Sequence, residues 1–133
     1  MGQCIMGFIV IMAIFSFESF VFSKPQNQNL LIGKWIWRES IHIDNRSYLS
    51  TPKLMGFRRS IVFTNDGNVI TYKNDTEIRV SKYELSRGTS IFDQQVHDLL
   101  TYDGGTYVIE ELTNKYLVLT KNSSDGYRSR FYR

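Results

Sequence analysis

The tripeptide Gly33-Lys34-Trp35, and the succession of short alternating segments that follows it, constrain the fold more than any other feature of this sequence. From Trp35 onward, apolar and polar residues alternate at period two, which is typical of half-buried β-strands. Between the segments stand turn signals such as Asp66-Gly67 and Asp103-Gly104, in which glycine supplies the positive φ that tight hairpins require. No segment of helical period is long enough to predict a helix, so the pattern indicates an all-β domain.

The N-terminal residues differ in composition from the rest. Ile5 to Phe17 is an apolar run without charge, about the length of a signal-peptide core and shorter than the roughly 20 residues of a spanning helix. We therefore expect a signal peptide over residues 1–23 with cleavage after Ser23, although Met1 to Cys4 carries no Lys or Arg. The alternatives are an incorrectly assigned start and a retained N-terminal helix. Export predicts a periplasmic, envelope-associated or secreted protein, with no membrane span once the signal is removed.

Removing 23 of the 133 residues leaves 110, which is enough for one domain. All 16 Lys and Arg remain against 12 acids, and a net charge of +4 is too small to predict nucleic-acid binding. Cys4 is the sole cysteine and leaves with the signal, so a hydrophobic core and sheet closure must stabilise the exported chain. The oligomeric state stays open.

Strand boundaries follow from the period-two pattern. Residues 24–30 contain Pro25 and several amides, which predicts a flexible N-terminal arm. The apolar phase slips between Val80 and Tyr83, which predicts a β-bulge near Ser81-Lys82. We expect eight strands, over residues 31–43, 57–64, 69–73, 76–85, 96–102, 106–112, 115–120 and 127–133.

Eight sequential antiparallel strands with mostly short links leave two exposed edges unless the first strand pairs with the last. Closure removes both edges and predicts an eight-stranded up-and-down β-barrel over residues 31–133. A barrel of this size has an interior that is filled by side chains or holds one small ligand. The 19 aromatic residues suit either interior, so composition leaves both open.

Five short sequence elements, in this order, carry a resemblance to a known family. They are Leu31-Ile32-Gly33-Lys34-Trp35, Ile61-Val62-Phe63-Thr64-Asn65-Asp66-Gly67, Tyr107-Val108-Ile109, Leu117-Val118-Leu119 and Phe131-Tyr132-Arg133. With these elements, the chain resembles the lipocalin superfamily, and more closely the small exported bacterial lipocalin-like domain proteins, over Leu31 to Arg133. The resemblance implies a barrel that carries a small hydrophobic molecule.

The lipocalin pattern includes a late arginine that stacks on the tryptophan of the first strand and closes the base of the barrel. The resemblance places Arg133 across Trp35, with Arg130 as second choice and Gly33 beside them, in a structural role. The chain departs from the pattern because it is short and lacks a long helix after the barrel, and because no cysteine remains once the signal with Cys4 is removed. These departures argue against a large ligand cavity.

The sequence gives little support for catalysis. His42 and His97 are the two histidines, and Asp98, the neighbour of His97, points to the opposite face of a strand. The acids Asp93 and Glu110-Glu111 have no partner that the sequence identifies. Because the chain has no glycine-rich phosphate loop, no cluster with metal-ligand spacing and no nucleophile elbow, we expect no enzyme activity, no metal and no cofactor.

The most suggestive position is Arg59, on the apolar face of its strand between Phe57 and Ile61. An inward charge is costly unless it meets an acid or an anionic ligand. The hypothesis is that Arg59, with Tyr72 or Tyr83, holds the carboxylate of an acyl-type ligand. The alternative is that the strand is bulged there or that Arg59 lies at the wet rim.

The sequence leaves two classes of function open. The first is a carrier that holds a small hydrophobic molecule in the barrel. The second is a filled, non-enzymatic barrel that acts as an exported interaction or inhibitor module, with the loops Asp44 to Pro52 and Gly88 to Gln95 as its contact surface.

Overall fold

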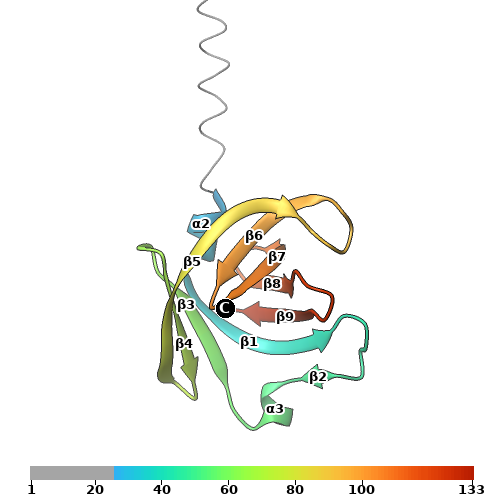
Figure 1. Ribbon diagram of the computed structural model, residues 1–133. Coiled ribbons are helices and arrows are strands. Elements are labelled where there is room, and N and C mark those ends of the chain that lie inside the picture. The colour runs from blue at the N-terminus through green and yellow to red at the C-terminus, as the bar shows by residue number, and fades with distance from the viewer. Residues whose placement is uncertain (1–25) are drawn as a thin grey trace, which may run out of the picture.

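The computed structural model describes residues 26–133, which form one antiparallel sheet closed into a barrel (Figure 1). The signal peptide expected over residues 1–23 lies outside the described residues. The strands are β1 (Gly33–His42), β2 (Leu49–Ser50), β3 (Arg59–Phe63), β4 (Asn68–Lys73), β5 (Thr76–Thr89), β6 (Val96–Tyr102), β7 (Gly105–Leu112), β8 (Tyr116–Lys121) and β9 (Tyr127–Tyr132). Two short helices, α2 (Gln26–Leu31) and α3 (Pro52–Met55), lie at opposite ends of the barrel (Figure 1).

Strand β1 closes the barrel by pairing with both β3 and β9. Its first residues, from Gly33 to Ile36, pair with β3, and its later residues, from Ile36 to His42, pair with β9. The expected all-β, eight-stranded, antiparallel closed barrel is therefore confirmed. The ninth strand, β2, has two residues and pairs with the end of β1, so it is an addition to the ring of eight.

The bulge predicted near Ser81-Lys82 is wrong, because both residues pair in regular register with β4. The register shifts instead at Ile78, where Thr71 pairs with Arg79 while the next residue of β4 pairs with Glu77. The break in apolar alternation between Val80 and Tyr83 has another cause, because Val80 lies on the outer face and is more than half exposed. An outward apolar residue imitates an inward one in the sequence pattern.

Residues 26–31 form helix α2, which differs from the flexible arm expected over residues 24–30. The helix is held by tertiary contacts: the side chain of Leu31 is fully buried, and its carbonyl accepts a hydrogen bond of 2.8 Å from Trp35 Nε1. Helix α2 thereby covers the base of the barrel, the end at which β1 begins. Within residues 26–133, no helix is long and apolar enough to cross a membrane.

The hydrophobic core fills the half of the barrel next to α2. Period-two alternation turns one face of every strand inward, and the inward aromatic and aliphatic side chains pack there. The buried members of the core are Leu31, Trp35, Trp37, Ile61, Phe63, Val69, Leu100, Leu117, Leu119 and Phe131. The filled base leaves room for a ligand only toward the other end.

Candidate ligand-binding site

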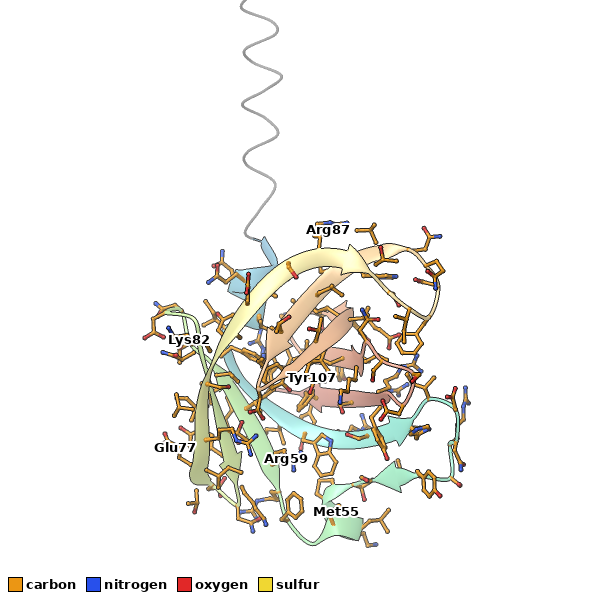
Figure 2. All side chains as sticks on the ribbon, in the orientation of Figure 1. Met55, Arg59, Glu77, Lys82, Arg87 and Tyr107 are labelled. Carbon is orange, nitrogen blue, oxygen red and sulfur yellow. The ribbon has the colours of Figure 1, made fainter. Side chains whose placement is uncertain are left out.

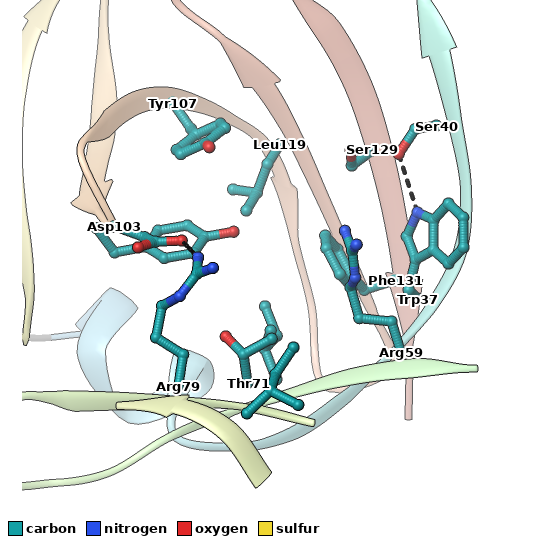
Figure 3. Close-up of a pocket in the computed structure, with 13 residues that line it drawn as sticks. Trp37, Ser40, Arg59, Thr71, Arg79, Asp103, Tyr107, Leu119, Ser129 and Phe131 are labelled. Carbon is teal, nitrogen blue, oxygen red and sulfur yellow. Dashed lines mark hydrogen bonds and ion pairs between the residues drawn. The ribbon is translucent and has the colours of Figure 1, made fainter. Parts of the chain in front are cut away.

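A cavity of about 210 Å³ lies above the packed core, and each of the eight barrel strands lines it (Figure 3). Paired residues on neighbouring strands share one face of the sheet, so the register explains which side chains meet there. Ile61 pairs with Thr71, and Ser40 pairs with Ser129, and all four line the cavity. The lining combines seven apolar or aromatic residues with six polar or charged ones, so it offers hydrogen-bonding groups as well as apolar surface.

Arg59 extends from the beginning of β3 toward the cavity mouth, where Figure 3 shows it beside Trp37. Its guanidinium carbon lies 5.5 Å from the ring centroids of both Trp37 and Phe57. These two rings are themselves stacked, with centroids 6.2 Å apart and planes 21° from parallel. Arg59 is exposed to solvent, and among the described residues it forms no ion pair with an acid. Its charge is therefore available to an anion at the mouth.

The second arginine of the cavity, Arg79, is already neutralised. It forms an ion pair with Asp103, from the hairpin between β6 and β7 (Figure 3). The pair joins β5 to the turn after β6, its neighbour in the sheet. The net charge of the cavity therefore resides on Arg59.

Two tyrosines form the wall near this ion pair. Tyr102 and Tyr107 stack with centroids 5.1 Å apart, because their strands are joined by a two-residue turn and both rings point inward. Burial is the main cause that raises the pKa of each hydroxyl, and the negative charge of Asp103 adds to it. Both hydroxyls are protonated at neutral pH, and in the part of the chain that the structure describes neither is hydrogen-bonded to protein. They are available as donors to a ligand.

A pair of serines provides a third polar group. Trp37 Nε1 donates to Ser40 Oγ at 2.9 Å, and Ser40 Oγ lies 2.7 Å from Ser129 Oγ. One hydroxyl proton joins the two serines, so the other remains free to face the cavity. The indole donor is satisfied without a ligand.

The residues expected to bind a ligand lie in different places. Arg59 and Ile61 line the cavity, and Phe57 contacts Arg59 from outside the lining. Tyr72 pairs with Ser60, on the face of the sheet opposite to Ile61 and Thr71, so it is not part of the lining. Tyr83 lies in the core, where its ring packs edge-on to Phe63 and its hydroxyl donates to the carbonyl of Thr64 at 2.8 Å.

Sequence reasoning missed Tyr102, Tyr107 and the Arg79–Asp103 pair. A signal for the tyrosines was present: the turn at Asp103-Gly104 pairs Tyr102 with Gly105, which places Tyr107 two residues further on the same face. Arg79 was missed because the exposed Val80 resembles an inward residue in the sequence, whereas regular pairing of Arg79 with Thr71 turns Arg79 inward.

The residues expected to close the barrel lie at its base, away from the cavity. The guanidinium carbon of Arg133 lies 4.0 Å from the ring centroid of Trp35, where the resemblance placed it. Arg130 pairs with Val118 and Glu39 on the outer face and does not contact Trp35. Gly33 has φ +123°, and a Cβ atom there would lie 3.0 Å from Arg133 Nη1.

The two histidines are outside the cavity. His42 Nδ1 accepts backbone hydrogen bonds from Asp44 and Asn45, and so shapes the loop after β1. His97 Nε2 lies 2.7 Å from a carboxylate oxygen of Asp93 in the loop between β5 and β6. Within residues 26–133, no group of three or more histidine, cysteine or acidic residues is arranged to hold a metal ion.

A larger hollow, of about 470 Å³, lies on the outer face of β7, β8 and β9. Its charges are largely compensated, since Arg128 Nε lies 2.6 Å from a carboxylate oxygen of Glu110. Its position on the outer wall separates it from the barrel interior. The cavity inside the barrel is therefore the better candidate for a specific site.

Comparisons with protein-family models, with curated proteins and with solved structures found no match. The geometry of the cavity is therefore the main indication of function.

Proposed function

We propose that this protein is an exported lipocalin-like binding protein whose barrel holds a small molecule with an apolar body and an anionic head. The observation that supports the proposal most is Arg59, a cation at the cavity mouth with aromatic rings beside it and no acidic partner among the described residues. No catalytic step is part of the proposal.

The chemistry of the mouth suits a carboxylate. A guanidinium presents two parallel donors that match the two oxygens of a carboxylate, and each hydrogen bond to a charged group contributes roughly 1.5 to 3 kcal/mol. The neutral hydroxyls of Tyr102 and Tyr107 add donors on the far wall. The apolar part of the ligand then lies against Ile61, Leu119 and Phe131.

The size of the cavity limits the ligand. A volume of about 210 Å³ is below the range of about 300 to 1,000 Å³ that is typical of sites for drug-sized molecules. We therefore propose a short acyl chain or a single ring with an acid group, rather than a long-chain lipid held whole.

Octanoate and octanol, measured by calorimetric titration, test this proposal because they share an apolar chain and differ in charge. We expect the protein to prefer octanoate, and Arg59→Gln to weaken octanoate binding about tenfold, which corresponds to about 1.4 kcal/mol, while octanol is unaffected. Arg58→Gln is the matched control, because Arg58 is adjacent but pairs with Asp75 at 2.9 Å outside the cavity. Equal affinities for octanoate in the wild type and Arg59→Gln would remove Arg59 from the site.

Export is a separate part of the proposal, motivated by the apolar run Ile5 to Phe17. Intact mass spectrometry of protein recovered from outside the cytoplasm checks it. We expect a chain that begins at Lys24, and recovery of the full 133-residue chain from the cytoplasm alone would contradict export.

The alternative, a filled interaction module, is favoured by the loop between β5 and β6. Asn122 holds this loop with two hydrogen bonds, to Ile91 N and Thr89 O, while Ile91 and Phe92 expose their side chains. A fixed loop with exposed apolar tips is typical of a protein contact surface. Native mass spectrometry separates the two functions: a co-purified small-molecule adduct supports the carrier, and a clean apo mass with no response to hydrophobic probes supports the module.

A further inference from the structure

The segment between β1 and β3 exposes four large apolar side chains within eight residues. Their exposed fractions are 61% for Tyr48, 42% for Leu49, 66% for Leu54 and 51% for Met55. We call these four residues the apolar rim. Such a concentration of exposed apolar surface is typical of an interaction site.

The exposure is built into the local structure. Thr51 caps α3, accepting a hydrogen bond of 3.1 Å from Leu54 N, and Gly56 ends the helix in the left-handed region, donating to the carbonyl of Pro52. Leu49 pairs with Ile41 in the sheet, and the carbonyl of Tyr48 accepts from His42 N. The fold therefore holds these side chains outward, and no residue of α3 is buried.

The apolar rim is next to the mouth of the cavity. Phe57 comes after Gly56, the residue that ends α3, and stacks on Trp37, which is part of the cavity wall. Arg59 lies two residues further on. Figure 2 shows Met55 and Arg59 on the same side of the molecule, and Figure 1 shows β2 and α3 outside the ring of barrel strands. A surface that the rim contacts therefore also faces the opening.

The charge of the same segment indicates the partner. Residues 44–59 contain four cations, Arg46, Lys53, Arg58 and Arg59, against the single acid Asp44. Arg58 is paired with Asp75, which leaves three cations against one acid. A partner that accepts apolar side chains and attracts surrounding cations is a lipid surface with anionic headgroups.

We propose that the apolar rim docks the protein on an anionic lipid surface with the mouth of the cavity toward the lipid. Docking would let the ligand pass between the lipid and the cavity, because amphipathic anions partition into membranes. This role for docking rests on the proposed function. The docking itself depends only on the rim and its charges.

Flotation with vesicles of phosphatidylcholine, with and without phosphatidylglycerol, tests the docking. Every variant is compared in the same full chain, so that any contribution of residues 1–25 is common to all. We expect the wild type to bind the anionic vesicles, and Leu54→Ser/Met55→Ser to lower the partition coefficient about tenfold. The matched control is Val80→Ser/Ile91→Ser, which removes two comparably exposed apolar side chains elsewhere and should bind like the wild type.

A charge variant tests whether the cations around the apolar rim contribute to binding of anionic lipid. We expect Lys53→Glu to weaken binding to phosphatidylglycerol vesicles, and Lys115→Glu, in the loop between β7 and β8, to have little effect. Equal binding of the wild type and the Leu54→Ser/Met55→Ser variant, or equal binding to neutral and anionic vesicles, would overturn the proposal. So would a dimer in sedimentation that this variant turns into a monomer, because a second copy would then occupy the rim.

Octanoate titration keeps the two proposals distinguishable. If docking is correct, Leu54→Ser/Met55→Ser loses vesicle binding and keeps octanoate affinity, which also shows that the variant is folded. Vesicle binding without any octanoate binding would contradict the proposed function and leave the docking supported.

Discussion

The guanidinium of Arg133 lies over the ring of Trp35, 4.0 Å from its centroid, and donates to three backbone carbonyls around it. The acceptors are Leu30 and Ile32, at the end of α2 and before β1, and Asn114, before β8. One side chain thus connects the covering helix, the first strand and the last strands at the base of the barrel. This arrangement gives two predictions on stability.

Arg133→Lys should lower the free energy of unfolding by about 1 to 2 kcal/mol, because a single ammonium cannot serve three separated carbonyls or stack on an indole. Urea unfolding followed by tryptophan fluorescence measures the change. Arg130→Lys, on the outer face, is the control and should change stability by less than about 0.5 kcal/mol. Equal effects of the two substitutions would contradict a special role for Arg133.

Gly33→Ala should destabilise the barrel by about 1 to 3 kcal/mol, since φ of +123° is unfavourable for a residue with a Cβ atom. The added Cβ would also crowd Arg133 Nη1 at 3.0 Å. Combining Gly33→Ala with Arg133→Lys removes that contact, so the double variant should be less destabilised than the sum of the single ones. Strict additivity would show that the crowding is absent.

Glu110→Gln should make stability less sensitive to acid. Burial alone raises the pKa of Glu110, but hydrogen bonds from Arg128 and Thr120 outweigh it and hold the pKa below its ordinary value. A lowered pKa means that the stabilisation is complete above pH 4.5, the ordinary value, and is lost as pH falls through the folded-state value.

Urea unfolding of the wild type and Glu110→Gln at a series of pH values measures this effect. We expect the wild type to be more stable by about 0.5 to 1 kcal/mol at neutral pH, with the difference shrinking below pH 4.5. Glu111→Gln is the neighbouring control, because among the described residues Glu111 forms no ion pair. A difference that stays constant with pH would contradict the ion pair as its source.

Tyr102→Phe should reduce the loss of stability at alkaline pH. Burial, helped by Tyr107 and Asp103, raises the pKa of Tyr102 above the ordinary 10.0, so the folded protein keeps its hydroxyl proton while the unfolded chain loses it. Stability therefore falls as pH rises above 10.0. Unfolding between about pH 9 and about pH 11 should show a shallower decline for Tyr102→Phe than for the exposed control Tyr116→Phe.

The strand order and the closure of the barrel were predictable because turn residues and period-two alternation are local properties of the sequence. Asp66-Gly67 and Asp103-Gly104 fix tight hairpins, and pairing of the first and last strands then follows from the need to remove two edges. Helix α2 was not predictable, because six residues are too few for a stable helix on their own. It forms through tertiary contacts with Trp35 and Arg133 that no local pattern encodes.

The cavity was harder to predict because it depends on register. Pairing of Ile61 with Thr71 turns Thr71 inward and Tyr72 outward, and a shift by one residue would have exchanged them. The sequence could place Arg59 and Ile61 together because they are two residues apart on one strand, so their side chains point to the same face of the sheet. Tyr102, Tyr107 and Arg79 come from other strands, so their meeting with Arg59 requires the three-dimensional barrel.

The pairing of β1 with β9 has a consequence for the order of folding. Ile36 pairs with Tyr132, 96 positions further along the chain, so the barrel cannot close before nearly all of the domain has emerged. Until then the edge of β1 has no partner from β9, and contacts between such distant segments form slowly because a long loop must be closed first. During this interval the incomplete sheet offers an open edge to other chains, so pairing between copies of the chain competes with closure of the barrel.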